Sequence, residues 1–229
     1  MSIKFSKYQI ATAAAVLFHT IGFAGIVFFK SDFIIQSTAF NLLLMFGLLI
    51  WTQKEKNIFF WLFVGATVLT GFVVEMIGVN TQLLFGNYSY GKVLGFQINK
   101  VPLIIGVNWF IIIYCCGISV QTLLTKAITK VATETSTPPM VLKALSVIVD
   151  GATLAVFIDW IMEPVAVQLA YWKWNGEIPL YNYICWFVVA MAMLAVFHFC
   201  KFNKQNKFAV HLLMIQVLFF LLLRTFLIS

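Results

Sequence analysis

The sequence predicts an all-α fold, a polytopic transmembrane bundle of about seven helices that forms one integral membrane domain over residues 1–229. Of these residues, 62% are hydrophobic and 10% are charged, and the mean hydropathy is +0.97. A soluble domain has about 25% charged residues. The chain also contains repeated apolar runs of about 20 residues, which is the length that crosses the hydrocarbon core. These observations exclude a soluble globular domain.

Seven apolar segments account for most of the chain. They cover approximately residues 8–29, 33–52, 58–79, 101–125, 142–163, 183–200 and 207–228. The first follows Lys4 and Lys7 and resembles a signal peptide, but its apolar run continues to Phe29 and is too long for one. We therefore expect it to be retained as the first helix. The short loop Lys30–Asp32 is the weakest of the predicted breaks.

The distribution of basic residues predicts the orientation. With a cytoplasmic N-terminus, ten lysines fall on the cytoplasmic side, and four lysines and one arginine fall outside. We therefore expect an N-in, C-out protein of the bacterial inner (cytoplasmic) membrane. These loop lysines account for the net charge of +7 without a basic patch on a polar surface, so we expect no nucleic-acid partner. The Ser/Thr/Pro-containing segment 126–143 is expected to be a flexible connector.

Glu75, Asp159 and Glu163 are the leading candidates for catalytic residues, because each lies near the end of a predicted span. Ionisable residues inside a membrane are candidates for function by default. Glu75 shares a helix face with Gly71 and Gly78, and small residues allow another helix to approach closely. We expect Glu75 to point into the bundle. The alternative is that it only hydrogen-bonds a neighbouring helix.

Asp159 and Glu163 are four residues apart and share a helix face, and Pro164 is expected to end or kink that helix. Two carboxyl groups so close in an apolar site do not both ionise cheaply. At least one is expected to stay protonated, as a general acid must. Because all three carboxyls lie on the same side of the membrane, we expect Glu75 to approach Asp159 or Glu163 in a shared pocket.

Other interpretations of these acidic residues are weaker. Asp159 and Glu163 could be an interfacial pair in water, or a DxxxE site for magnesium diphosphate, but the nearby loop offers only Lys173 as a base. Asp150 lies on the opposite helix face from Asp159, and His19 suits a structural hydrogen bond. No set of His or Cys residues has metal-ligand spacing, so we expect no metal and no organic cofactor.

The loops 80–100 and 164–182 follow the carboxyls and are rich in Tyr, Trp and Gly. Tyr and Trp are favoured at the membrane interface, so the loops either re-enter the membrane or cap the bundle. Aromatic faces could also stabilise a cation, although interface anchoring alone would explain them. The predicted substrate-binding residues are Tyr88, Tyr90, Trp109, Trp172, Trp174 and Asn182.

Two stretches carry a resemblance to a known family. Residues 75–90, EMIGVNTQLLFGNYSY, with LG at 94–95 and VP at 101–102, resemble EIIGVxTGxxFGxYxY…LG…GVP. Residues 159–182, from DWIMEP through WKW to IPLYN, resemble WDxxLDP…GxWxW…GIPxxN. Both are signatures of the membrane carotenoid biosynthesis protein family, although Gln82 replaces a glycine and Glu163 an aspartate.

That family includes carotenoid 1,2-hydratases that act on γ-carotene, lycopene and bisanhydrobacterioruberin. The resemblance implies a lipophilic carotenoid substrate and cofactor-free hydration of the terminal C1–C2 double bond of an acyclic ψ-end. A protonated carboxyl, expected to be Asp159, would protonate C2. Glu75 is expected to hold the water that adds at C1. The alternatives are a lycopene-cyclase-like enzyme that uses the same acid step, and a non-catalytic carotenoid-binding membrane protein.

Overall fold

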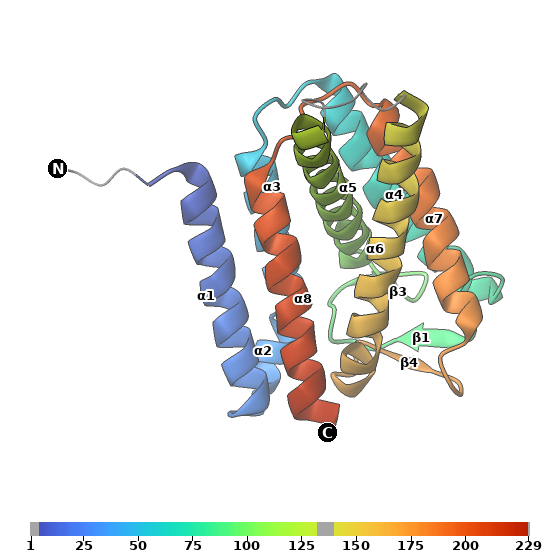
Figure 1. Ribbon diagram of the computed structural model, residues 1–229. Helices are drawn as coiled ribbons and strands as arrows, with labels where there is room; N and C mark the ends of the chain where they lie inside the picture. The colour runs from blue at the N-terminus through green and yellow to red at the C-terminus, as the bar shows by residue number, and fades with distance from the viewer. Residues whose placement is uncertain (1–4, 132–139, 229) are drawn as a thin grey trace.

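The computed structural model describes residues 5–131 and 140–228, and nearly all of its regular structure is helical (Figure 1). The helices are α1 (Lys7–Val27), α2 (Asp32–Gln36), α3 (Thr38–Thr52), α4 (Ile58–Thr81), α5 (Ile104–Val131), α6 (Met140–Gln168), α7 (Leu180–Phe199) and α8 (Lys207–Ile228). The short strands are β1 (Tyr88–Tyr90), β2 (Gln97–Ile98), β3 (Val101–Pro102) and β4 (Trp172–Trp174). The predicted all-α bundle is confirmed. Residues 132–139, the middle of the expected connector 126–143, lie outside the described residues.

Six of the helices, α1, α4, α5, α6, α7 and α8, are long and apolar enough to cross a membrane. The shortest has 20 residues, and at about 1.5 Å per residue it reaches the roughly 30 Å thickness of the hydrocarbon core. These helices match six of the seven predicted segments, with ends that differ by a few residues. The chain is an integral membrane protein.

The remaining predicted segment, 33–52, is not one continuous helix. Ser37 separates α2 from the 15-residue α3, which is only about 22 Å long. The Ser37 hydroxyl donates to the carbonyl of Phe33, and Thr38 donates to that of Ile35. Such side chains compete with regular helical hydrogen bonding. The α3 helix still runs opposite to α1 and α4, so the start of α1 and the end of α8 lie at opposite ends of the bundle (Figure 1).

The central helix of the bundle is α5. In its most apolar stretch 83% of the residues are buried, against 22–39% in the other five long helices, which present more of their surface outward. It packs against α3, α4, α6, α7 and α8. The first turns of α5 are therefore surrounded by protein, and they carry Asn108 and Trp109.

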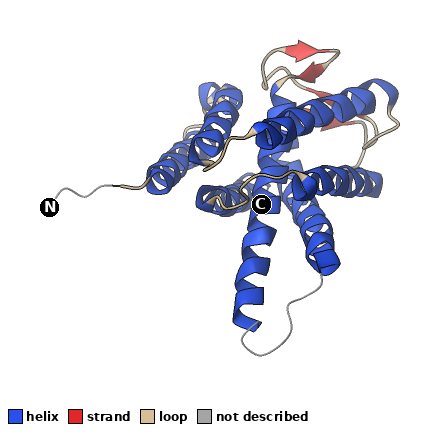
Figure 2. Cartoon of the chain, turned by 90° about the horizontal axis from the view of Figure 1, so that it is seen from above, coloured by secondary structure: helices blue, strands red, loops and turns tan. Residues whose placement is uncertain are grey.

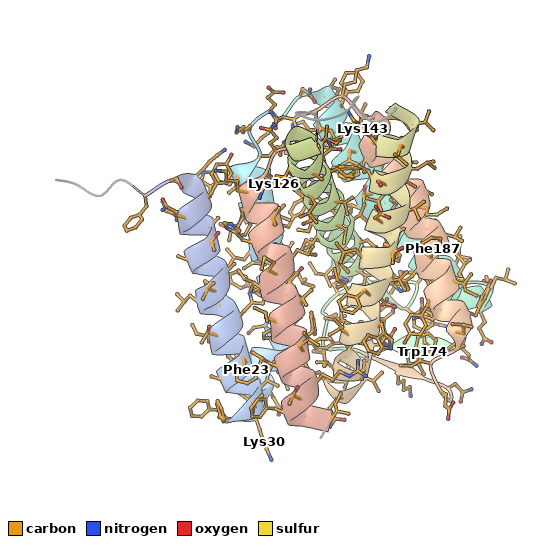
Figure 3. The ribbon with its side chains drawn as sticks, viewed as in Figure 1. Phe23, Lys30, Lys126, Lys143, Trp174 and Phe187 are labelled. Carbon is orange, nitrogen blue, oxygen red and sulfur yellow. The ribbon has the colours of Figure 1, made fainter. Side chains whose placement is uncertain are left out.

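The two ends of the bundle differ in chemistry. Lys7 lies 3.5 Å from the carbonyl oxygens of Trp51 and Gln53, and Gln53 donates to the carbonyl of Asn203. These contacts bring the start of α1 and the α3–α4 and α7–α8 loops to one lysine-rich end. Figure 3 shows Lys126 and Lys143 toward this end and Trp174 toward the other.

The two aromatic loops join into one strand-paired cap at the opposite end (Figure 1). Strand β1 pairs antiparallel with β4, with Tyr88 opposite Trp174 and Tyr90 opposite Trp172. Strands β2 and β3 form a hairpin, and the strands gather on one side of the bundle (Figure 2). Alternate residues of a strand point to opposite faces, so the four rings of β1 and β4 share a face.

Helix α6 continues past Pro164 to Gln168, so of the two expected effects of this proline, an end or a kink of the helix, the end is wrong. Proline removes one N–H donor and clashes with the preceding turn. The helix resumes because later backbone groups find regular partners, such as the Leu169 N–H on the carbonyl of Val165 at 2.9 Å. It ends near Ala170, which has φ +56°. This extra turn carries the chain from Glu163 to β4.

Candidate active site

Glu75 points into the bundle, as the spacing of α4 predicts. The buried face of α4 includes Thr67, Gly71, Glu75 and Gly78. A Cβ added at Gly71 would lie 2.5 Å from the Cβ of Trp109. The glycine therefore lets α5 approach closely, which brings the indole of Trp109 to the Glu75 carboxyl.

Three donors hold the Glu75 carboxyl. Tyr88 and Tyr90 donate their hydroxyls to Oε2 at 2.5 and 2.7 Å. Trp109 donates its Nε1–H to Oε1 at 2.9 Å. Glu75 is only 4% exposed, so these bonds replace the water that the carboxyl loses on burial. Both tyrosines come from β1, on the inner face of the cap.

Glu163 is held in the same way from the other strand of the cap. Trp172 and Trp174 each donate an indole N–H to Oε2 at 2.9 Å. The amide of Asn182, on α7, lies 3.5 Å from Oε1. One strand pair therefore supplies donors to two carboxyls on two different helices.

Asp159 differs from the two glutamates. The Asn182 amide donates to Oδ2 at 3.0 Å. Its other oxygen, Oδ1, is buried and has no hydrogen-bond partner among the described residues. Asp159 therefore keeps one oxygen available inside the bundle.

All nine predicted site residues line one cavity. The residues around it are Glu75, Phe85, Tyr88, Tyr90, Ile105, Asn108, Trp109, Asp159, Met162, Glu163, Trp172, Trp174, Asn182 and Trp186. The space that the centre of a water molecule can occupy is about 20 Å³, and about 10–15 Å³ is enough for one water. The structure thus brings the three carboxyls together around room for one small molecule. Their chemical roles stay predictions.

Five lining residues were not among the predicted site residues, namely Phe85, Ile105, Asn108, Met162 and Trp186. Two of them, Trp186 and Asn108, bear on the argument. Trp186 stacks on Trp109, with ring centroids 3.7 Å apart and planes at 13°. It follows Asn182 by four residues, so the two share a face of α7, and this spacing is the signal that could have found it. Asn108 precedes Trp109 directly and gave no such signal.

Tyr88 and Tyr90 stay protonated beside Glu75. Burial raises the pKa of both hydroxyls far above the ordinary value, and the charge of Glu75 adds to this effect. A protonated phenol donates its hydrogen. The two tyrosines are therefore permanent donors to the carboxyl and not acids near neutral pH.

The lower-ranked residues lie outside this site. Asp150 is exposed and is not part of the cavity lining. His19 is buried, and its Nδ1 lies 2.8 Å from the carbonyl of Ala15 in its own helix. Within residues 5–131 and 140–228, no three His, Cys, Asp or Glu side chains group as metal ligands.

The fold and site define a polytopic membrane protein with a buried carboxyl cluster beneath an aromatic cap. The family model of carotenoid biosynthesis proteins matches residues 33–229, so the chain belongs to that family. The matched region contains all three carboxyls and both strands of the cap. Searches of curated proteins and of solved structures return no match to the chain.

Proposed function

We propose that the protein hydrates the terminal C1–C2 double bond of an acyclic carotenoid ψ-end. The observation that carries this proposal is the cavity itself, in which three buried carboxyls surround space for about one water. One carboxyl oxygen, Oδ1 of Asp159, has no partner there among the described residues. Acid-catalysed addition of water to an alkene needs a proton donor, a water and a proton acceptor in one dry site.

In the proposed reaction, the protonated Asp159 carboxyl donates its proton to C2. The π electrons form the new C2–H bond and leave a tertiary cation at C1. Aromatic faces around the cavity, including the stacked Trp109 and Trp186, favour that cation through their quadrupoles. The water oxygen then bonds to C1.

Glu75 is the proposed acceptor of the proton that the water releases. A carboxylate has about four acceptor positions, and three on Glu75 are used by Tyr88, Tyr90 and Trp109. One position is left for a water. Transfer of the proton back to Asp159 through the carboxyl cluster restores the acid, so one water is consumed for each alcohol formed.

Hydration, and not cyclisation, is favoured by a polar depression next to the site. Tyr88 and Trp174 line both the carboxyl cavity and a surface depression of about 230 Å³. The other residues of the depression are Asn87, Ser89, Lys173 and Asn175. A polar opening beside the cavity supports a supply of water from the capped end. A cyclase, which captures the cation with an internal double bond, has no need of it.

Product analysis in a lycopene-producing host tests the proposal. In ¹⁸O-labelled water, the expected product has the mass of the substrate plus one labelled water, and its new hydroxyl oxygen carries the label. The Asp159→Asn variant should lose about 10²–10⁴-fold of this activity, the usual contribution of a general acid. Asp150→Asn, the same change on the exposed side of α6, should leave it near normal.

Three outcomes contradict the proposal. A product with the mass of the substrate but a ring would identify a cyclase, and an unchanged carotenoid that stays bound would identify a binding protein. Near-normal turnover in a well-folded Asp159→Asn preparation would remove Asp159 as the acid.

A further inference from the structure

A second, larger cavity lies between α1, the α2–α3 region and α8. Its volume is about 300 Å³, at the lower end of the range of about 300–1,000 Å³ for ligand pockets. Its walls are mainly apolar, and the rim residues Phe18, Phe33 and Phe40 are exposed. Since the outer surface of this bundle faces lipid, the groove opens sideways toward the hydrocarbon.

The groove adjoins the carboxyl cavity. Asn108, at the start of α5, lines both. Tyr171 lines the groove and directly precedes Trp172, which donates to Glu163. The Tyr171 hydroxyl lies 2.7 Å from Thr38 Oγ1, so this edge of the groove is tied to α3. Asn108 is therefore the residue at which the two cavities meet.

Three polar side chains of the mainly apolar groove have unused hydrogen-bonding capacity. Gln216 is only 6% exposed, and its Oε1 has no partner. The Oδ1 of Asn41 is also buried without a partner. These two statements hold for the residues that the structure describes. His19 donates Nδ1–H to Ala15, which leaves Nε2 as an acceptor.

These groups indicate the chemistry of the ligand. An unpaired buried polar group is costly, so its partner is to be sought on whatever fills the site. A polyene alone would leave the two amide oxygens and His19 Nε2 without partners. A hydroxyl group has one hydrogen and two lone pairs, so it can donate to His19 Nε2 and accept from the NH₂ groups of Gln216 and Asn41 when each amide is turned with its nitrogen toward the groove.

We infer that the groove binds an isoprenoid alcohol, with its chain against the apolar walls and its hydroxyl on Gln216, Asn41 and His19. The source of this ligand, which rests on the proposed function, is the alcohol formed in the carboxyl cavity. After hydration, the new C1 hydroxyl moves past Asn108 into the groove. There it hydrogen-bonds to the amides of the groove in place of the carboxyls. The groove is therefore a second site, where the product is held before it returns to the lipid.

Equilibrium binding to the purified protein in lipid nanodiscs tests this site. The probes are the tritiated ten-carbon alcohol 2,6-dimethyloctan-2-ol, which copies a hydrated ψ-end, and the matching alkene 2,6-dimethyloct-2-ene, each corrected for uptake by empty nanodiscs. The alcohol should bind about tenfold more tightly, which is the effect of one buried hydrogen bond. In Gln216→Leu and Asn41→Leu this preference should disappear while alkene binding stays. An unchanged preference in both variants would overturn the inference.

A variant whose new side chain fills the groove provides the second binding comparison. A Cβ added at Gly22 would lie 3.5 Å from Cε2 of Phe219, and Gly22 lines the groove. We therefore expect Gly22→Leu to lose both ligands. Gly47→Leu on α3 is the matched control, because its added Cβ meets nothing within 4 Å. Equal loss in both variants would mean that the groove is not the binding site.

Failure of this inference can be told apart from failure of the proposed function. Asp159→Asn should keep the alcohol preference, because the groove does not depend on the chemistry of the carboxyls. In a lycopene-producing host, hydroxylated carotenoid should co-purify with the wild type about tenfold more than with Gln216→Leu. If a different hydroxylated lipid co-purifies instead, the carboxyl cavity is not the source of the ligand.

Discussion

At the scale of single residues, the three carboxyls differ in the donors that surround them. Glu75 and Glu163 each accept from three side chains. Asp159 accepts from Asn182 alone and keeps Oδ1 without a partner in the described structure. Donors stabilise an ionised carboxylate, whereas a protonated carboxyl has its own O–H to present. This difference supports the proposal that Asp159 is the acid.

The contact between Gly71 and Trp109 allows a prediction about a single methyl group. Gly71→Ala should destabilise the protein by about 1–3 kcal/mol, the usual cost of overpacking, because the added Cβ overlaps the Cβ of Trp109. Thermal unfolding in detergent measures this change. Gly65→Ala, on the open face of the same helix, has the same gain in helix propensity without the clash. Equal melting temperatures for the two variants would contradict the prediction.

At the scale of elements, the β1–β4 pair connects the two glutamates of the site. It holds Glu75 of α4 through tyrosines and Glu163 of α6 through tryptophans. Helix α4 packs against α5, and α6 packs chiefly against α7 and α5. The cap and the first turns of α5 thus set the relative positions of carboxyls on different helices.

Gly91 is a point of close approach between the two loops of the cap. Its N–H donates to the carbonyl of Tyr171 at 2.8 Å, and an added Cβ would lie 2.2 Å from the carbonyl oxygen of Ala170. Gly91→Ala should separate the loops and reduce product formation while the helices remain folded. Hydrogen exchange of β1 and β4 should rise. Ser89→Ala, on the outer face of β1, is the control, and unchanged exchange in Gly91→Ala would contradict this account.

The elements were not equally predictable from the sequence. Hydropathy was enough for six long helices, and i, i+4 spacing placed Glu75, Asp159 and Glu163 on inward faces. The strand pair was missed, because YSY and WKW are only three residues long and lie more than 80 positions apart. The break at Ser37 and the passage of α6 through Pro164 depend on local hydrogen bonds. Hydropathy does not report on such bonds.

At the scale of the whole molecule, the bundle has a lysine-rich end and an aromatic, carboxyl-bearing end. Basic loops favour the cytoplasmic side, so the candidate active site should face the outer side. In right-side-out vesicles, a membrane-impermeant maleimide should label Asn175→Cys, and it should label Lys54→Cys only after the vesicles are opened. Both variants need Cys200→Ser, because the other three cysteines are buried. If only Lys54→Cys were labelled in sealed vesicles, the orientation would be the opposite of the one expected.

The stacked indoles of Trp109 and Trp186 give the site an optical signal of its own. Parallel rings 3.7 Å apart share their excited states, so their ultraviolet circular dichroism should form a paired positive and negative band. Trp186→Phe should abolish this couplet, whereas Trp61→Phe, an exposed ring of α4, should preserve it. Both indoles border the carboxyl cavity. The shape of the couplet should therefore change when the cavity is filled, which would allow occupancy to be followed without a coloured or labelled ligand.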